Sequence, residues 1–200
     1  MTPFLVLAAA YLIGSIPFGY LLVRFKTGED VRSKGSGNIG ATNVLRTTGR
    51  LLALLTLLLD IAKGFFAVWL MATVADHSPA WMSAAALAVM AGHAYPVFLK
   101  FHGGRAVASF IGAFLYLTPI PMVAALALFA IVAAATRHIS MASIITAGSL
   151  PLAAYFIEHP PPVMLAATIV AGAFIIYRHQ ANISRIRAGT EFTLDLGRRK

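Results

Sequence analysis

Residues 106–136 read AVASFIGAFLYLTPIPMVAALALFAIVAAAT, and the way in which they fold decides the architecture of this chain. As a single helix, rising 1.5 Å per residue, the stretch would be about 46 Å long. That is too long for a simple crossing of a ~30 Å hydrocarbon core. Pro119 and Pro121 lie near the middle, where proline interrupts helical hydrogen bonding. The stretch is therefore either one long span or a hairpin of two short spans.

The composition places the whole chain in a membrane. Its 200 residues are 59% hydrophobic, with a mean hydropathy of +0.80, which is far too apolar for a soluble domain of this length. The first apolar segment is expected to be a span rather than a cleaved signal peptide, because no Lys or Arg precedes it and it continues through Pro17 to Arg24. The apolar segments cover 3–23, 51–75, 81–99, 106–118, 120–136, 141–157 and 163–177.

The distribution of basic residues favours the hairpin. Fifteen of the sixteen Lys and Arg residues, all except Lys63, lie in 24–50, in 100–105, at 137 and in 178–200. No Lys or Arg lies in the intervening connections, which are 76–80, 119–121 and 158–162. With a hairpin all fifteen lie on one side, which the positive-inside rule identifies as cytoplasmic, whereas a single span would divide them. We therefore expect an all-α, polytopic membrane helix bundle of seven transmembrane helices. It forms a single domain over 1–200, with the N-terminus outside and the C-terminus in the cytoplasm.

The same distribution explains the net charge of +9 as membrane orientation, so no nucleic-acid partner is expected. The absence of cysteine excludes a thiol nucleophile, a thioester intermediate and thiolate metal sites. The chain also lacks the Gly-x-Ser-x-Gly, His-Glu-x-x-His and His-x4-Asp patterns of other catalytic sites. No cofactor or metal is predicted.

The first polar motif is residues 35–43, GSGNIGATN, followed by Arg46 and Arg50. Glycine allows positive φ and close approach of a ligand to the backbone, and successive N–H groups in such a loop form a concave anion site. The alternative is an ordinary polar turn, which explains the glycines but not the arginines. The loop lacks the Gly-Lys-Ser/Thr ending of a nucleotide-binding loop.

Two further motifs lie on the predicted cytoplasmic side. Residues 92–106, GHAYPVFLKFHGGRA, place Gly-Gly-Arg at a helix start, which favours an anion; the alternative is a plain turn. His93, deeper in its helix, is expected to be a hydrogen-bonded packing residue. In residues 178–185, RHQANISR, His179 and Asn182 share one helix face, where they could orient or deprotonate a hydroxyl. The alternative there is a basic helix end among lipid headgroups.

Two weaker signals involve residues spaced three apart. Ser140 and Ser143 fall on one face of an inward-facing helix start. Asp60 and Lys63 lie inside a span, where charges are functional candidates, but their spacing favours a structural ion pair that holds the second helix in the bundle.

Together, these motifs resemble the bacterial acyl-phosphate-dependent glycerol-3-phosphate acyltransferases. The likeness extends over almost the whole chain and includes Ser15-Ile16-Pro17 and Asp60-x2-Lys63-Gly64. The resemblance implies seven spans and a cytoplasm-facing site in the bacterial inner membrane. It implies transfer of a fatty acyl group from acyl phosphate to the 1-hydroxyl of sn-glycerol 3-phosphate, giving lysophosphatidic acid and phosphate. The implied partners are these two substrates, the lipid bilayer and, transiently, the soluble enzyme that produces acyl phosphate.

The resemblance also implies residue roles. The implied catalytic residues are Ser36, Arg46, His179 and Asn182. Acyl phosphate would be bound by Ser36, Gly37, Asn38, Gly40, Ala41, Thr42 and Ser143. Glycerol 3-phosphate would be bound by Arg46, Gly103, Gly104, Arg105, His179 and Asn182. Asp60, Lys63 and Glu191 would be structural. Either His179 or a substrate phosphate oxygen could take the proton, and we favour substrate assistance with His179 orienting the hydroxyl.

One departure from the family pattern concerns the second motif. The family usually has Gly-Gly-Lys-Gly-Val-Ala where this chain has Gly103-Gly104-Arg105-Ala106-Val107-Ala108. Arg keeps the charge with a different geometry, and Ala106 is expected to remove the freedom for positive φ. Two other functions remain open on the residues alone: a transporter of an anionic solute, and a structural membrane subunit that recruits a cytosolic partner.

Overall fold

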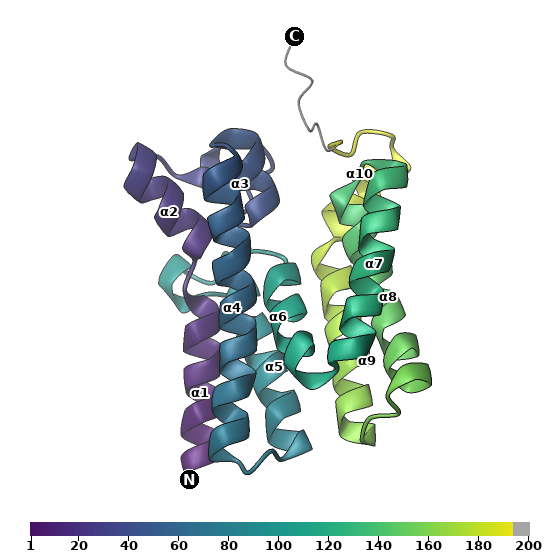
Figure 1. The fold of residues 1–200 in the computed structure, drawn as a ribbon. Helices are drawn as coiled ribbons and strands as arrows, with labels where there is room; N and C mark the ends of the chain where they lie inside the picture. Colours follow the sequence, from purple (N-terminus) through teal and green to yellow (C-terminus); the bar gives the residue numbers. More distant parts are fainter. Residues whose placement is uncertain (194–200) are drawn as a thin grey trace.

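The computed structural model describes residues 1–193, and within that range the regular structure is helical throughout. Figure 1 shows two groups of helices, with α1 to α6 in one and α7 to α10 in the other. The α-helices are α1 (Thr2–Ser15), α2 (Phe18–Thr27), α3 (Ala41–Thr47), α4 (Arg50–Val74), α5 (Pro79–Ala94), α6 (Val107–Leu117), α7 (Pro119–Thr136), α8 (Ile139–Ile157), α9 (Pro162–Arg178) and α10 (Gln180–Arg187). Two 3-10 turns, η1 (Val31–Ser33) and η2 (Val97–Leu99), complete these elements.

The decisive stretch is broken, as its prolines predict. α6 ends at Leu117 and α7 begins at Pro119, with Thr118 between them. Within the described residues, five helical segments are long and apolar enough to cross a membrane, or six if α9 and α10 form one bent span. α6 has 11 residues, about 16 Å, and is too short to cross the hydrocarbon core alone. The number of seven full spans therefore stays a prediction.

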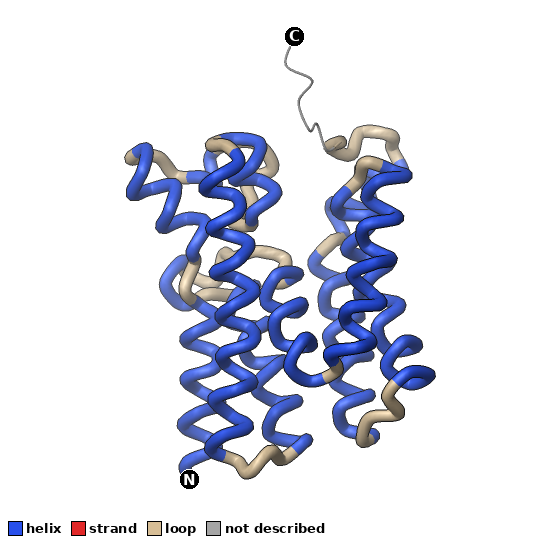
Figure 2. Tube along the Cα trace, in the orientation of Figure 1, coloured by secondary structure: helices blue, strands red, loops and turns tan. Residues whose placement is uncertain are grey.

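The short α6 is explained by the segment that precedes it. Figure 2 shows the loop between α5 and α6 lying part-way along the bundle, below α2 and α3. The connection after α4 and the start of α1 lie at the opposite end of the bundle from α3 and α10 (Figure 1). The second motif thus enters the bundle instead of lying at its end.

The first apolar segment, predicted as a span over 3–23, lies in one candidate span, Thr2–Thr27, which is broken into two helices. α1 ends at Ser15 and α2 begins at Phe18, because Pro17 cannot continue the backbone ladder. Lys63 Nζ donates to the carbonyl oxygen of Ile16 at this break, 2.9 Å away. The same ammonium lies 2.8 Å from Asp60 Oδ1, the ion pair that the spacing predicts. The pair therefore fixes α4 against the α1–α2 break.

Small residues let α4 and α6 pack closely. A side chain at Gly64 would overlap the backbone of Ser109, and one at Gly112 would overlap the backbone of Ile61. The buried core beside this contact is filled by larger side chains: Met71, Met90, Phe110, Phe114 and Met122. Close packing of this kind is the main source of helix association in lipid, where apolar burial alone gives little.

Candidate active site

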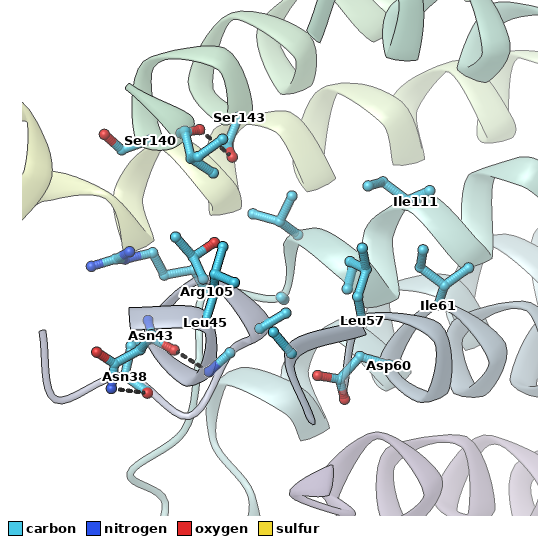
Figure 3. Close-up of a pocket in the computed structure, with 18 of the residues that line it drawn as sticks. Asn38, Asn43, Leu45, Leu57, Asp60, Ile61, Arg105, Ile111, Ser140 and Ser143 are labelled. Carbon is cyan, nitrogen blue, oxygen red and sulfur yellow. Dashed lines mark hydrogen bonds between the residues drawn. The ribbon is translucent and has the colours of Figure 1, made fainter. Parts of the chain in front are cut away.

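A cavity of about 600 Å³ lies between the two helix groups and collects residues from all three motifs. Its polar wall includes Ser36, Asn38, Thr42, Arg46, Arg105, Ser140, Ser143, His179 and Glu191. Its apolar wall includes Leu54, Leu57, Ile61, Ile111, Leu115, Leu126 and Phe129. Figure 3 shows Ser140 and Ser143 across the cavity from Asn38 and Asn43, while Leu57, Ile61 and Ile111 lie to one side. The cavity can therefore hold an anionic group next to an apolar chain.

Asn43 organises the first motif. Its buried amide Nδ2 donates to the carbonyl oxygens of Val31, Lys34 and Asn38 at 3.1, 3.1 and 2.8 Å. Its Oδ1 accepts from the Ser36 N–H at 2.8 Å. Gly35 has a φ of +59°, and a side chain there would overlap Asn43 Oδ1. The loop is therefore held from inside by one side chain, and Ser36 is presented at the cavity wall.

Asn38 shapes the start of α3. Its Oδ1 accepts from the Gly40 N–H at 2.8 Å, a local turn in which the side chain replaces a backbone acceptor. Gly40 then precedes the first residue of α3, so Ala41 and Thr42 lie on the cavity wall. The sequence predicted one anion site from these residues, and in the structure they line the same cavity as Arg46.

The second motif turns sharply at its two glycines. The Gly104 N–H donates to the His93 carbonyl oxygen at 3.0 Å, and the Gly103 N–H to that of Ala94 at 3.2 Å. Ala106 has a φ of +63° in spite of its Cβ. The expectation that Ala106 would avoid this conformation is therefore wrong, because the turn imposes it at a cost of about 1 kcal/mol. The turn points Arg105 into the cavity.

The third motif surrounds a buried carboxylate. Glu191 Oε1 accepts from Asn182 Nδ2 at 2.6 Å and from Ser140 Oγ at 2.8 Å. Its Oε2 accepts from Arg185 Nε at 2.7 Å. Asn182, predicted to hold the acceptor, is 2% exposed and does not line the cavity, while Glu191 does. In this structure Asn182 supports Glu191.

His179 lies at the junction of α9 and α10 and on the cavity wall. Its Nδ1 donates to the Ile175 carbonyl oxygen at 2.8 Å, since a carbonyl can only accept. In the neutral ring Nε2 therefore carries the lone pair and can accept a hydrogen bond from a hydroxyl.

Positive charge exceeds negative charge at the polar wall. Burial lowers the pKa of Arg105 to about 10, with a further decrease from Arg185, so the guanidinium is charged at neutral pH but poorly solvated. Burial raises the pKa of Glu191, but hydrogen bonds from Asn182, Ser140 and Arg185 outweigh it, and the net pKa is lowered. A bound phosphate would compensate the remaining positive charge.

The chain after α10 covers this region. The guanidinium of Arg46 lies 4.8 Å from the ring centre of Phe192, and that of Arg185 lies 5.5 Å from it. Cation–π contacts of this length connect Arg46 and Arg185 through one aromatic ring. Three residues of the predicted basic cluster, Arg198, Arg199 and Lys200, lie outside the described residues.

Several predicted residues stand behind the cavity wall. Gly37, Gly103, Gly104, Asn182 and Lys63 do not line it. In contrast, Asp60 and His93 do. His93 was expected to be a hydrogen-bonded packing residue, and no sequence pattern indicated its pairing with Asp60, 33 positions earlier.

These features define a helical integral membrane protein whose cavity joins a positively charged polar wall to an apolar wall. The glycerol-3-phosphate acyltransferase family matches residues 4–189. A glycerol-3-phosphate acyltransferase of Geobacter sulfurreducens is 46% identical over 184 residues, covering 92% of this chain and 93% of that protein. One of Jannaschia sp. is also 46% identical, covering 91% and 88%.

A solved structure agrees with these relatives. It is the crystal structure of PlsY, an integral membrane glycerol 3-phosphate acyltransferase, in the glycerol 3-phosphate form. It is 36% identical, covers 98% of this chain and 96% of that chain, and superposes with a TM-score of 0.91. The chain belongs to the glycerol-3-phosphate acyltransferase family and is an acyltransferase of phospholipid synthesis.

Proposed function

We propose that the protein transfers a fatty acyl group from acyl phosphate to the 1-hydroxyl of sn-glycerol 3-phosphate, releasing lysophosphatidic acid and phosphate. The observation that carries this proposal is the convergence of Ser36, Arg46, Arg105 and His179 on one cavity with an apolar wall. Both proposed substrates carry phosphate, and the donor also carries an acyl chain. The polar wall of the cavity could bind the two phosphate groups, and the adjoining apolar wall could bind the acyl chain of the donor.

The donor phosphate fits the first motif. The Ser36 hydroxyl and the backbone around Gly40, Ala41 and Thr42 supply neutral donors, and Ser143 faces them across the cavity. The acyl chain would then lie along the apolar wall formed by α4, α6 and α7. Aliphatic side chains give such a chain a favourable environment without specific contacts.

The acceptor phosphate fits the arginines. Arg46 and Arg105 line the same part of the cavity, and a planar guanidinium can bind phosphate with two parallel hydrogen bonds. Gly103 and Gly104 would set the direction of Arg105. Asn182 would act through Glu191, which it supports at 2.6 Å.

The reaction needs no covalent enzyme intermediate. The acceptor oxygen attacks the acyl carbonyl carbon, a new ester C–O bond forms, and the C–O bond to phosphate breaks. The proton of the hydroxyl passes to an oxygen of a substrate phosphate, while His179 Nε2 orients the hydroxyl. Acyl phosphate is a mixed anhydride with a good leaving group, so positioning and charge stabilisation are the main tasks of the protein.

The orientation in the bilayer follows from the basic residues. We propose a bacterial inner-membrane location with seven crossings, an outside N-terminus, and the cavity facing the cytoplasm. A soluble enzyme that makes acyl phosphate would deliver the donor to that face.

The test is an assay of the purified protein with acyl phosphate and glycerol 3-phosphate. We expect phosphate release together with lysophosphatidic acid, unchanged by a metal chelator. Replacement of acyl phosphate by acyl-CoA should abolish the product. Robust turnover with acyl-CoA alone, or loss of activity in chelator, would contradict the proposed donor chemistry.

A further inference from the structure

The buried side chain of His93 is held on its Nδ1 side by two polar groups. Ser109 Oγ lies 3.2 Å from Nδ1, and Asp60 Oδ1 lies 3.6 Å from it. His93 and Asp60 are 3% and 2% exposed, yet both line the cavity. These three residues, Asp60, His93 and Ser109, join α4, α5 and α6.

The surroundings fix the tautomer of the ring. Asp60 is ion-paired with Lys63 and therefore carries its negative charge, so a lone pair on Nδ1 would face a carboxylate. A proton on Nδ1 removes that repulsion and can be donated to Ser109. The neutral imidazole then carries its lone pair on Nε2. The charge of Asp60, 3.6 Å from Nδ1, thus favours the tautomer in which Nε2 of His93 accepts a hydrogen bond, while Ser109 Oγ is the hydrogen-bond partner of Nδ1.

Nε2 is directed to the place where the first and second motifs meet. A side chain at Gly104 would overlap Nε2 of His93 and would lie 3.4 Å from Asn38 Oδ1. Because residue 104 is a glycine, no side chain fills the space between this ring edge and Asn38. The N–H of Gly104 also donates a hydrogen bond to the carbonyl oxygen of His93, at 3.0 Å.

We propose that His93 Nε2 accepts a hydrogen bond from the 2-hydroxyl of glycerol 3-phosphate and so fixes which hydroxyl attacks. This inference rests on the proposed function, in which Arg46 and Arg105 bind the phosphate and His179 orients the 1-hydroxyl. The acceptor substrate has two hydroxyl donors, and the wall offers two imidazole acceptors, His179 and His93. One acceptor for each hydroxyl satisfies both without leaving a buried polar group unpaired.

The experiment compares glycerol 3-phosphate with 1,3-propanediol phosphate, which keeps the phosphate and the attacking hydroxyl but lacks the 2-hydroxyl. Wild-type protein should prefer glycerol 3-phosphate by about 10-fold in kcat/KM, the effect of one buried hydrogen bond. In His93→Asn, whose amide reaches only as far as Nδ1, the preference should fall to about 1. In His93→Gln, whose amide reaches the position of Nε2, most of the preference should remain.

Matched measurements separate this contact from other causes. His179→Ala should lower kcat with both acceptors and leave the preference intact. Inhibition by inorganic phosphate should be the same in His93→Asn and wild type, because the phosphate contacts are untouched. A wild-type protein that does not distinguish the two acceptors would overturn the inference without any variant. An equal decrease in kcat/KM for both acceptors in His93→Asn would also overturn the inference.

Failure of the proposed function gives a different result. In that case wild-type protein makes no acylated product from either acceptor, whereas failure of the His93 inference leaves turnover of glycerol 3-phosphate by the wild type normal. Thermal unfolding of each variant in detergent shows whether it has folded. If His93→Asn does not fold, the inference is tested by the ratio of kcat/KM for the two acceptors in the wild type and in His93→Gln.

Discussion

Arg178 Nη2 lies 2.9 Å from the carbonyl oxygen of Gly104, so the end of α9 holds the glycine turn that precedes α6. Nε of Arg178 donates to the same carbonyl oxygen of Gly104, at 3.2 Å. The guanidinium also lies 4.8 Å from the ring centre of Tyr95. Two motifs separated by 74 positions are thereby joined outside the cavity.

We expect Arg178→Lys to weaken the acceptor site although Arg178 does not line it. Lysine keeps the charge but cannot make two parallel contacts or stack on Tyr95. The value of kcat/KM for glycerol 3-phosphate should fall about 10-fold, equivalent to about 1.4 kcal/mol. The KM for acyl phosphate should be unchanged. Steady-state kinetics of Arg178→Lys beside the exposed Arg187→Lys provides the matched pair, and equal behaviour of the two variants would refute the coupling.

Arg105 tests the acceptor phosphate site. If it binds that phosphate, Arg105→Ala should remove about 2–3 kcal/mol, typical of charge-assisted hydrogen bonds. This corresponds to about 30- to 150-fold in kcat/KM for glycerol 3-phosphate. Arg105→Lys should retain much of the activity, since lysine is usual at this position in the family. An unchanged KM and kcat/KM in Arg105→Ala would show that the second motif does not bind the acceptor.

The neighbouring Ala106 supplies a control for geometry. Because its φ is +63°, Ala106→Gly should relieve strain and stabilise the protein by about 1 kcal/mol. Ala108→Gly, inside α6, should instead destabilise by about 0.5–1 kcal/mol. The double change Arg105→Lys, Ala106→Gly should then recover more activity than Arg105→Lys alone.

Asn43 should be as important to the first motif as any residue that touches substrate. Asn43→Ala removes four hydrogen bonds and leaves buried backbone groups without partners, for a loss of about 3 kcal/mol in the free energy of unfolding. Asn43→Asp keeps the acceptor for the Ser36 N–H but sets an oxygen against three carbonyl oxygens, so it should be no better. Thermal unfolding and the KM for acyl phosphate measure both effects. Wild-type values in Asn43→Asp would exclude this role.

Glu191 makes stability depend on pH in a defined direction. Its pKa in the folded protein lies below its ordinary value of 4.5, so the folded state favours the carboxylate. That contribution is fully present above pH 4.5 and is lost as the pH falls through the lower folded value. The Tm of wild type should exceed that of Glu191→Gln at pH 7, and the difference should shrink below pH 4.5. A constant difference down to pH 3 would contradict the assignment.

The orientation in the membrane can be tested with single cysteines, since the chain has none. Cysteines at Ser33, His102 and Arg187 should react with an impermeant maleimide only from the cytoplasmic side, and one at Ser78 only from outside. His102 is exposed, whereas a side chain at Gly103 would overlap the backbone of His93. Labelling at Arg187 from outside would mean an even number of crossings.

The class of protein, the break at Pro119 and the three motifs could be predicted from the sequence. These features depend on local properties, because hydropathy sets which segments enter lipid and proline interrupts a helix. The i,i+3 spacing of Asp60 and Lys63 likewise predicts a contact within one helix, and the contact is present at 2.8 Å.

The depth of the second motif and the partners of His93, Asn182 and Arg178 became visible only in the folded chain. Each of these depends on the packing of helices that are far apart in sequence, where small residues such as Gly64 and Gly112 set how closely backbones approach. The left-handed conformation of Ala106 has the same origin, because contacts with His93 and Ala94 fix the turn more strongly than the local preference of alanine. Local chemistry indicated which polar groups could bind phosphate, and long-range packing set their directions.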